Sequence, residues 1–344
     1  MPALSHRGGT VLVTGATGFV GVWIVKKLLE SGYQVKCAVR NDSKAQHLKN
    51  LFASHLEQLQ LTPVGDISDE GVFDEAVKNV SAIIHTASPV HMRANDPEDI
   101  INPAVRGTLG ILESALRYGS QLERIVLTSS CAAICSQSET NITLSELDWN
   151  DPSVQECREK GREALPLSKY SASKVLAEKA AWQFYERHKP EIAWDLTVLN
   201  PPWIFGPTLH EVPDFTAINP SWKLWFRAVT QGAEAQLTRP GHGWVDVRDV
   251  AEAHVRSLEV ATAGGERIII CASQFVWQDW IVVAASMKNL RDHYKIANPV
   301  QGTISRAILF DSSKQKEILA IDFHKMEDVV RDSLENFHAR GWAV

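Results

Sequence analysis

Residues 11–21 read Val-Leu-Val-Thr-Gly-Ala-Thr-Gly-Phe-Val-Gly, and this stretch decides the fold. It starts as a short apolar run rich in β-branched residues and passes through glycines into residues 19–30, where apolar side chains recur at helical spacing. The pattern predicts a strand, a tight turn and a helix. Glycines spaced G-x-x-G-x-x-G in this setting are typical of a turn that binds a dinucleotide.

Each of the three glycines has a physical role in such a turn. Gly15 lets the chain turn sharply off the strand, Gly18 leaves room for a pyrophosphate beside the backbone, and Gly21 lets the helix pack close to the sheet. The helix N-terminus adds unpaired N–H groups and a positive dipole end. A merely structural tight turn is the alternative. The cofactor contacts expected here are Thr14, Gly15, Thr17, Gly18, Phe19, Val20 and Gly21.

Composition limits the other possibilities. The 344 residues suffice for one large α/β domain with a smaller lobe, and the formal net charge is −6 without a basic cluster that would favour nucleic acid or a membrane surface. No apolar run approaches the roughly 20 residues that cross a bilayer. The first ten residues do not resemble a signal peptide, so we expect a cytoplasmic protein. Its five cysteines lack metal-ligand or disulfide spacing and are expected to be free thiols.

Strand and helix patterns alternate along the chain. Further strands are expected at residues 34–40, 59–64, 82–87, 124–130, 194–200 and 267–271. Helices are expected at residues 44–56, 69–80, 97–118, 170–189, 247–260 and 326–338. This order predicts an α/β protein of the Rossmann type, with a doubly wound parallel sheet and a ligand crevice at the carboxyl ends of its strands.

Two irregular stretches interrupt the alternation. Residues 136–168 are polar and are expected to form a long loop region with little sheet character. Residues 201–240 are rich in proline and tryptophan, which indicates a departure from the sheet. We therefore expect residues 1–202, joined again by residues 241–273, to form the dinucleotide-binding domain. Residues 203–240 and 274–344 are expected to form a smaller substrate-binding lobe.

Tyr170 and Lys174 are the first candidates for chemistry. Four residues apart, they lie on one face of the helix expected at residues 170–189. A neighbouring ammonium lowers the pKa of a phenol by stabilising the phenolate, which makes tyrosine a usable acid or base. A surface tyrosine beside a solvated lysine would have the same spacing. The pair follows the strand that ends in Thr128-Ser129-Ser130, close to where a nicotinamide would lie.

These pieces together resemble an extended short-chain dehydrogenase/reductase. The resemblance is to the branch of dihydroflavonol and cinnamoyl-CoA reductases that includes fungal and yeast carbonyl reductases. It spans roughly residues 10 to 255. The sequence departs from the branch in having no recognisable flavonoid-binding or coenzyme A-binding signature. The matching segments are residues 14–21, 65–67, 85–89, 128–130, 170–174, 200–207 and 245–250.

The resemblance implies roles for particular residues. Ser130 would polarise the substrate carbonyl, Tyr170 would donate the proton, and Lys174 would lower the pKa of the tyrosine and hold the nicotinamide ribose. Ser129 would support Ser130. Hydride transfer to a carbonyl carbon builds negative charge on the oxygen, which hydroxyl donors stabilise.

The choice of dinucleotide depends on the residues after the second strand. Arg40 and Lys44 give a cationic pocket that suits a 2′-phosphate, so NADPH is expected and NADH is possible, although Asp42 lies close by. Asp66 and Ile67 match the adenine contacts of the family or form a structural turn. The resemblance places the remaining cofactor contacts at Thr86, Ala87, Ser88, Thr128, Ser129, Asn200, Pro201, Pro202 and Ile204, with Tyr170 and Lys174.

The substrate pocket is less clear from sequence. Apolar residues of the variable segments would line it beside Ser130 and Tyr170, although each taken singly is more often a core residue than a pocket residue. They are Val90, Ile134, Trp203, Phe205, Trp222, Trp225 and Phe226.

The function expected is that of an NADPH-dependent carbonyl reductase, a monomer or homodimer, acting reversibly on aldehydes or ketones. Alternatives are an NAD-dependent hydroxysteroid-type dehydrogenase or a sugar epimerase of the same superfamily. A protein of another class, a regulator that senses the dinucleotide without catalysis, is the third alternative.

Overall fold

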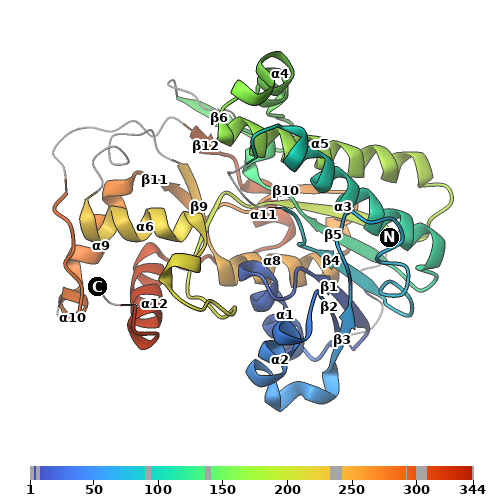
Figure 1. The fold of residues 1–344 in the computed structure, drawn as a ribbon, viewed down its shortest axis with the longest axis horizontal. Coiled ribbons are helices and arrows are strands. Elements are labelled where there is room, and N and C mark those ends of the chain that lie inside the picture. The colour runs from blue at the N-terminus through green and yellow to red at the C-terminus, as the bar shows by residue number, and fades with distance from the viewer. Residues whose placement is uncertain are drawn as a thin grey trace.

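A seven-stranded parallel sheet forms the centre of the larger part of the molecule (Figure 1). The computed structural model describes residue 4 and residues 8–89, 94–135, 141–232, 242–291, 293–299 and 308–342. The strands are β1 (Thr10–Thr14), β2 (Gln34–Val39), β3 (Leu59–Pro63), β4 (Ala82–His85), β5 (Arg124–Thr128), β7 (Asp195–Asn200) and β10 (Arg267–Ile269). The expected doubly wound fold is confirmed.

The strand order β10-β7-β5-β4-β1-β2-β3 places the point where the chain changes direction between β1 and β4. Thr14 pairs with His85 at the carboxyl ends of these two strands. In open α/β sheets a crevice forms at this switch point, because the helices that follow the two strands go to opposite faces. The glycine turn after β1 therefore lies at the expected ligand crevice.

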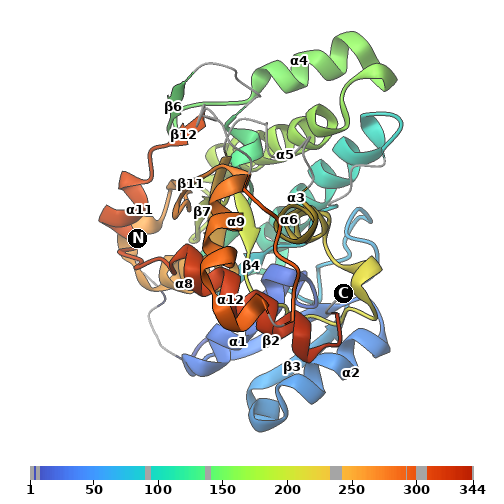
Figure 2. The same ribbon diagram turned by 90° about the vertical axis from the view of Figure 1, so that its left-hand side faces the viewer.

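Helices cover both faces of the sheet, as Figure 2 shows end-on. One face carries α1 (Phe19–Glu30), α2 (Asp42–Leu51) and α8 (Val247–Glu259), which share an apolar core with β1 and β2. The other face carries α3 (Glu98–Tyr118) and α5 (Pro166–His188), packed against each other and against a second core. Both faces are thus buried, which explains why the inner strands are almost wholly apolar.

Two predictions of secondary structure were wrong. Residues 69–80 form a series of turns and no regular helix, since Gly71 and Asn79 adopt positive φ angles of 71° and 57°. Residues 136–168 were expected to be a loop region, yet they contain α4 (Asp151–Lys160). Asn150 caps this helix through a bond from the N–H of Ser153, and a proline follows in the first turn, where proline favours a helix start.

A smaller lobe lies beside the sheet, at the left of Figure 1. It holds a three-stranded sheet of β8 (Trp203–Phe205), β9 (His242–Asp246) and β11 (Ser273–Phe275), in the order β11-β9-β8. Its helices are α6 (Pro220–Gln231), α9 (Trp277–Ser286), α10 (Lys288–Arg291) and α12 (Met326–Ala339). Aromatic side chains from these segments form a separate core.

Two late segments return to the larger part. The strand β12 (Ile308–Phe310) pairs with β6 (Ile142–Leu144), and Leu319, just after α11 (Ser313–Ile318), packs into the core beside α8. Short 3₁₀ turns occupy residues 53–58, 131–133, 161–163, 215–217 and 261–263. Among the residues that the structure describes, no helix combines the length and apolarity that crossing a membrane requires.

Candidate active site

The glycine turn after β1 is held too tightly for side chains at two of its glycines. Gly15 has a φ of +67°, and a Cβ there would lie 2.5 Å from Thr86 Oγ1. A Cβ on Gly21 would lie 2.1 Å from the carbonyl oxygen of Gly15. A Cβ on Gly18 would meet only that same oxygen, at 3.2 Å, so the backbone beside Gly18 stays open. The sequence predicted the same roles: a sharp turn at Gly15, open backbone at Gly18 and close helix packing at Gly21.

The first turn of α1 is available for an anion. Gly18 occupies the N-cap position, and no side chain caps the helix. Free N–H groups and the positive dipole end at such a terminus suit a phosphate. The open backbone at Gly18 and the uncapped helix therefore fit the pyrophosphate of a dinucleotide.

Hydrogen bonds join the carboxyl ends of β1 and β4 next to this turn. Thr86 Oγ1 donates to the carbonyl oxygen of Thr14 at 2.7 Å, and the N–H of Ala87 donates to Thr14 Oγ1 at 3.3 Å. Thr14 Oγ1 also lies 2.9 Å from His85 Nδ1. Burial lowers the pKa of His85 to about 3, so its ring is neutral and its unpartnered Nε2 stays uncharged.

Tyr170, Lys174 and Ser130 come together at the same edge of the sheet. The Ser130 hydroxyl lies close enough to that of Tyr170 to lower the pKa of the phenol. Lys174 Nζ donates to Ser88 Oγ, 3.0 Å away on the loop after β4, and lies 5.9 Å from the centre of the Tyr170 ring. The loops after β4 and β5 thus meet the first two turns of α5, as the spacing predicted.

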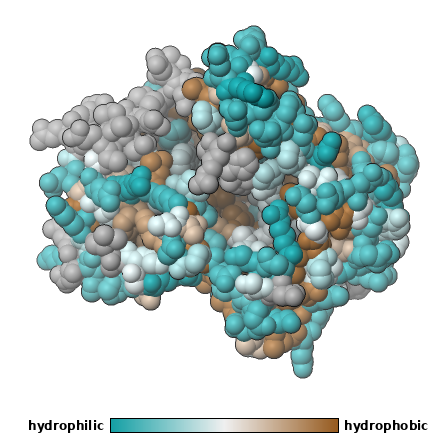
Figure 3. All heavy atoms as spheres, viewed as in Figure 1, coloured by the Kyte–Doolittle hydropathy of each residue, from teal (hydrophilic) through white to brown (hydrophobic). Residues whose placement is uncertain are grey.

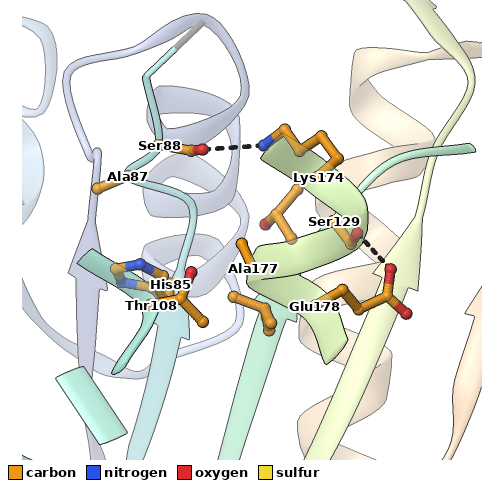
Figure 4. A pocket seen from close by; sticks show the side chains of 10 residues that line it. His85, Ala87, Ser88, Thr108, Ser129, Lys174, Ala177 and Glu178 are labelled. Carbon is orange, nitrogen blue, oxygen red and sulfur yellow. Dashed lines mark hydrogen bonds between the residues drawn. The ribbon is translucent and has the colours of Figure 1, made fainter. Parts of the chain in front are cut away.

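A small pocket lies behind these residues, with room for about one water molecule. Figure 4 shows Ser88 and Lys174 at one end, His85 and Thr108 at one side, and Ser129 and Glu178 at the other side. The walls come from β4, β5, α3 and α5. The pocket is therefore polar although it is built into the core of the domain.

Burial governs the ionisation of the two central groups. It lowers the pKa of Lys174 to about 8, against the opposing influence of Glu178. It raises the pKa of Tyr170, while the hydrogen bond with Ser130 lowers it. Lys174 was expected to lower the pKa of Tyr170, but in the protein alone burial dominates and Tyr170 remains a protonated donor at neutral pH.

Sequence reasoning missed a buried cluster behind this site. Glu178 accepts hydrogen bonds from Ser129 Oγ at 2.5 Å and from Asn200 Nδ2 at 2.9 Å, and it pairs with Arg267. Asn200 Nδ2 also contacts the carbonyl oxygen of Ser130 at 3.2 Å. The only signal in the sequence was the spacing, because Glu178 follows Lys174 by four residues on the same helix face.

The residues expected at the adenine end lie around β2. Arg40 is exposed at the end of β2, and Lys44 pairs with Glu211 of the lobe at 2.9 Å. The carboxylate of Asp66 accepts hydrogen bonds from the N–H and hydroxyl of Ser68, so it stabilises a turn. The Ile67 side chain packs into the core against α3. The Ile67 side chain is therefore not open to an adenine, whereas Asp66 is exposed and both bonds from Ser68 end on its Oδ1.

The remaining predicted cofactor contacts lie nearby. The hydroxyl of Thr128 bonds to His254, the carbonyl oxygen of Pro201 lies 3.4 Å from Ser130 Oγ, and Pro202 is partly exposed. Ile204, on β8, packs between the two cores. Thr17 and Val20 lie partly exposed beside Phe19 at the start of α1.

The predicted substrate residues fall into two groups. Trp203 is partly exposed, whereas four others are buried in the aromatic core of the lobe: Phe205, Trp222, Trp225 and Phe226. Ile134 is buried beside β12, and Val90 lies outside the described residues. Figure 3 shows a hollow near the middle of one face with hydrophobic residues at its floor.

A Rossmann sheet with an open glycine turn and a Tyr–Lys pair at its switch point defines a dinucleotide-binding protein. Residues 11–271 match the model of the NAD dependent epimerase/dehydratase family. The chain belongs to this family, which confirms the resemblance inferred from the motifs.

Individual relatives are similar over almost their whole length. The NADPH-dependent methylglyoxal reductase GRE2 of Saccharomyces cerevisiae is 31% identical over 336 residues, which cover 94% of this chain and 96% of that protein. The ketoreductase azaE of Aspergillus niger is 34% identical, with coverage of 94% and 96%. The crystal structure of yeast methylglyoxal/isovaleraldehyde reductase Gre2 with NADPH matches with a TM-score of 0.86 at 29% identity, covering 97% of this chain and 99% of that one.

Proposed function

We propose that this chain is an NADPH-dependent carbonyl reductase that converts an aldehyde or ketone into an alcohol, reversibly. The observation that carries the proposal is that Ser130, Tyr170 and Lys174 lie together at the carboxyl edge of the sheet, with Lys174 Nζ bonded to Ser88 Oγ on the loop after β4. Lys174, one helical turn from Tyr170, lies at the same edge of the sheet, beside the glycine turn. Relatives with names such as methylglyoxal reductase and ketoreductase support the same chemistry.

Each residue has one task in this proposal. Ser130 and Tyr170 donate hydrogen bonds to the carbonyl oxygen as negative charge develops on it, and Tyr170 then transfers its proton. Lys174 holds a ribose hydroxyl and provides a positive charge that stabilises the phenolate left on Tyr170. The cofactor, when bound, supplies the hydride.

The two parts of the molecule bind different ligands in this proposal. We assign the dinucleotide to the larger part, which is built on the seven-stranded sheet, and the carbonyl compound to the smaller lobe, whose sheet takes in β9 and which β12 and α11 leave to rejoin the larger part. The 2′-phosphate would meet Arg40 and Lys44. The hydrophobic floor of the hollow favours a substrate of apolar character (Figure 3).

An absorbance assay at 340 nm tests the proposal directly. The protein is mixed with NADPH or NADH and a panel of aldehydes and ketones that ranges from methylglyoxal to aryl ketones. We expect NADPH to be consumed faster than NADH.

The Tyr170→Phe variant should bind NADPH as the wild type does, yet lose at least a hundredfold in kcat, because general acid catalysis contributes about 10²–10⁴. Fluorescence titration with NADPH checks the binding. An active Tyr170→Phe variant would remove the proton-donor assignment, and a wild type that binds NADPH but reduces no carbonyl would favour a dinucleotide-sensing regulator.

A further inference from the structure

The active-site face of α5 carries a carboxylate, Glu178, behind Tyr170 and Lys174. Glu178 is only 1% exposed, so its carboxylate has left water almost entirely. A buried carboxylate is costly unless hydrogen bonds and an opposite charge compensate it. Its surroundings should therefore show what holds it in place.

Both oxygens of Glu178 are bound. Oε2 accepts from Ser129 Oγ and from Asn200 Nδ2, and Oε1 accepts from Arg267 Nε at 2.5 Å. Arg267 is in turn fixed by the carbonyl oxygens of Glu146 and Asp148, at 2.8 and 2.7 Å. Its guanidinium lies 3.7 Å from the centre of the Trp149 ring. The carboxylate is thus fixed by residues at the ends of three strands, β5, β7 and β10.

These contacts control the position of Ser130. Ser129 precedes Ser130 at the end of β5, and Asn200 bonds to both Glu178 and the carbonyl oxygen of Ser130. Glu178 and Tyr170 belong to one continuous helix. The carboxylate therefore sets how far the Ser130 hydroxyl lies from that of Tyr170.

The carboxylate also lines the same pocket as Lys174, one helical turn away on α5 (Figure 4). Of the described side chains that line the pocket, Glu178 is the single carboxylate, and the remaining polar ones are uncharged: His85, Ser88, Thr108, Thr128 and Ser129. Arg267, which carries a charge of the same sign as Lys174, lies on the far side of Glu178. Among the described residues that line the pocket, Glu178 supplies the only negative charge that favours the charged form of Lys174, and the Ser88 hydroxyl adds a hydrogen bond to the amine.

We infer that Glu178 is a positioning residue of the proposed reductase, which fixes Ser130 against Tyr170 and keeps Lys174 charged. The inference rests on the proposed function for its catalytic consequence. It agrees with the opposing influences on the pKa of Lys174, which burial lowers and Glu178 raises. A purely structural ion pair would explain the burial but would not affect the titration of Lys174.

The Glu178→Gln variant tests the inference, since it removes the charge and keeps the shape. We expect the alkaline limb of kcat/KM for NADPH, which reports the free enzyme, to move down by about one pH unit. At pH 8, near the pKa of Lys174, the variant should then lose roughly fivefold in kcat/KM, and the loss should approach tenfold at higher pH. Should the unpaired Arg267 prevent folding, the double variant Glu178→Gln/Arg267→Met leaves no lone buried charge and should show the same shift.

Asp195→Asn is the matched control. Asp195 and Arg124 form another buried pair at the opposite edge of the same sheet, with Arg124 Nε 2.5 Å from Asp195 Oδ1. Breaking this pair should reduce stability and leave the pH profile unchanged, because the pair is remote from the pocket. A shift in Asp195→Asn equal to that in Glu178→Gln would overturn the inference.

A second measurement does not depend on turnover. In protein labelled with ε-¹³C-lysine, NMR follows the titration of Lys174, which is assigned with Lys174→Arg. A lower titration midpoint in Glu178→Gln supports the inference, and an unchanged midpoint with an unchanged pH profile overturns it. If the wild type reduces no carbonyl, the proposed function fails, while the midpoint still decides whether Glu178 keeps Lys174 charged.

Discussion

At the scale of single residues, the proposed preference for NADPH rests on two cations that are only loosely engaged. Lys44 pairs with Glu211, but both side chains are more than a third exposed. Such surface pairs are worth about 0–1 kcal/mol, so a 2′-phosphate dianion would displace the carboxylate. Arg40 is exposed and lies next to β2. A bound 2′-phosphate could therefore pair with both Arg40 and Lys44 without disturbing the fold.

Arg40→Ala should lower kcat/KM for NADPH by roughly tenfold to a hundredfold, because a hydrogen bond to a charged group contributes about 1.5–3 kcal/mol. The value for NADH should stay nearly constant. Lys49→Ala, which removes an exposed cation from the same region of the surface, serves as the control. Equal losses with both dinucleotides would show that Arg40 stacks on the adenine instead of binding the phosphate.

The residues differ in how far the sequence could predict them. Tyr170 and Lys174 were found because their chemistry depends on a local spacing along one helix. Glu178 has the same spacing from Lys174, but in a sequence such a pair is typical of an exposed helix surface. Its burial depends on Asn200 and Arg267, which join it only when distant strands meet. The sequence around Glu178 therefore gives no sign that this residue is buried.

At the scale of elements, the packing of α1 on the sheet depends on Gly21. A Cβ at this position would lie 2.1 Å from a backbone oxygen, so α1 must move away from the turn in Gly21→Ala. We expect a loss of about 1–3 kcal/mol in the free energy of unfolding, together with weaker NADPH binding. Urea unfolding and a fluorescence titration measure the two effects.

Gly110→Ala is the control, because this helical glycine of α3 has no neighbour closer than 3.9 Å to the added Cβ. Alanine favours a helix over glycine by about 0.8–1.0 kcal/mol, so this variant should be as stable as the wild type or more stable. If both variants behaved alike, close contact at Gly21 would not matter for the fold.

The errors in predicted secondary structure came from proline, glycine and asparagine, whose effect on the backbone depends on where they lie in a segment. The proline at position 152 was interpreted as part of a loop, but behind the cap of Asn150 it starts α4. Residues 69–80 have helical spacing of apolar side chains, yet left-handed backbone at Gly71 and Asn79 divides them into turns. Hydrophobic spacing identifies the buried face of a segment better than its backbone conformation.

At the scale of the whole molecule, the lobe was the least predictable part because distant segments build it. Its core combines β8, β9 and β11 with α6, α9 and α12. Trp222 and Trp225 lie edge to face with ring centres 4.9 Å apart, and both are fully buried. Large aromatic side chains bury much surface, so a tryptophan-rich segment supplies a core as readily as a substrate pocket.

Buried histidines connect the layers of the molecule and make its stability depend on pH. His254 Nδ1 donates to the carbonyl oxygen of Val250 at 2.7 Å, so Nε2 accepts from the Thr128 hydroxyl, also at 2.7 Å. This neutral ring joins α8 to β5. Burial lowers the pKa of His254 to about 4, and it acts in the same direction on His85 and His210.

The sign of the effect follows from the unfolded chain, where histidine has a pKa of about 6.5. Below that pH His254 is protonated in the unfolded chain but stays neutral in the folded protein, because burial lowers its pKa there. The stability present above pH 6.5 is therefore lost as the pH falls towards 4, by about 1.4 kcal/mol per pH unit for each such histidine. His324 acts in the opposite direction, because its hydrogen bond with Asp249 raises its pKa.

Urea unfolding at pH 7, 6 and 5 measures this dependence. We expect the free energy of unfolding of the wild type to fall steadily over this range. In His254→Gln one titrating group is gone, so stability should be lower at pH 7 but should fall less steeply, by about 1.4 kcal/mol per pH unit. An unchanged slope in His254→Gln would mean that His254 already binds a proton in the folded protein above pH 5.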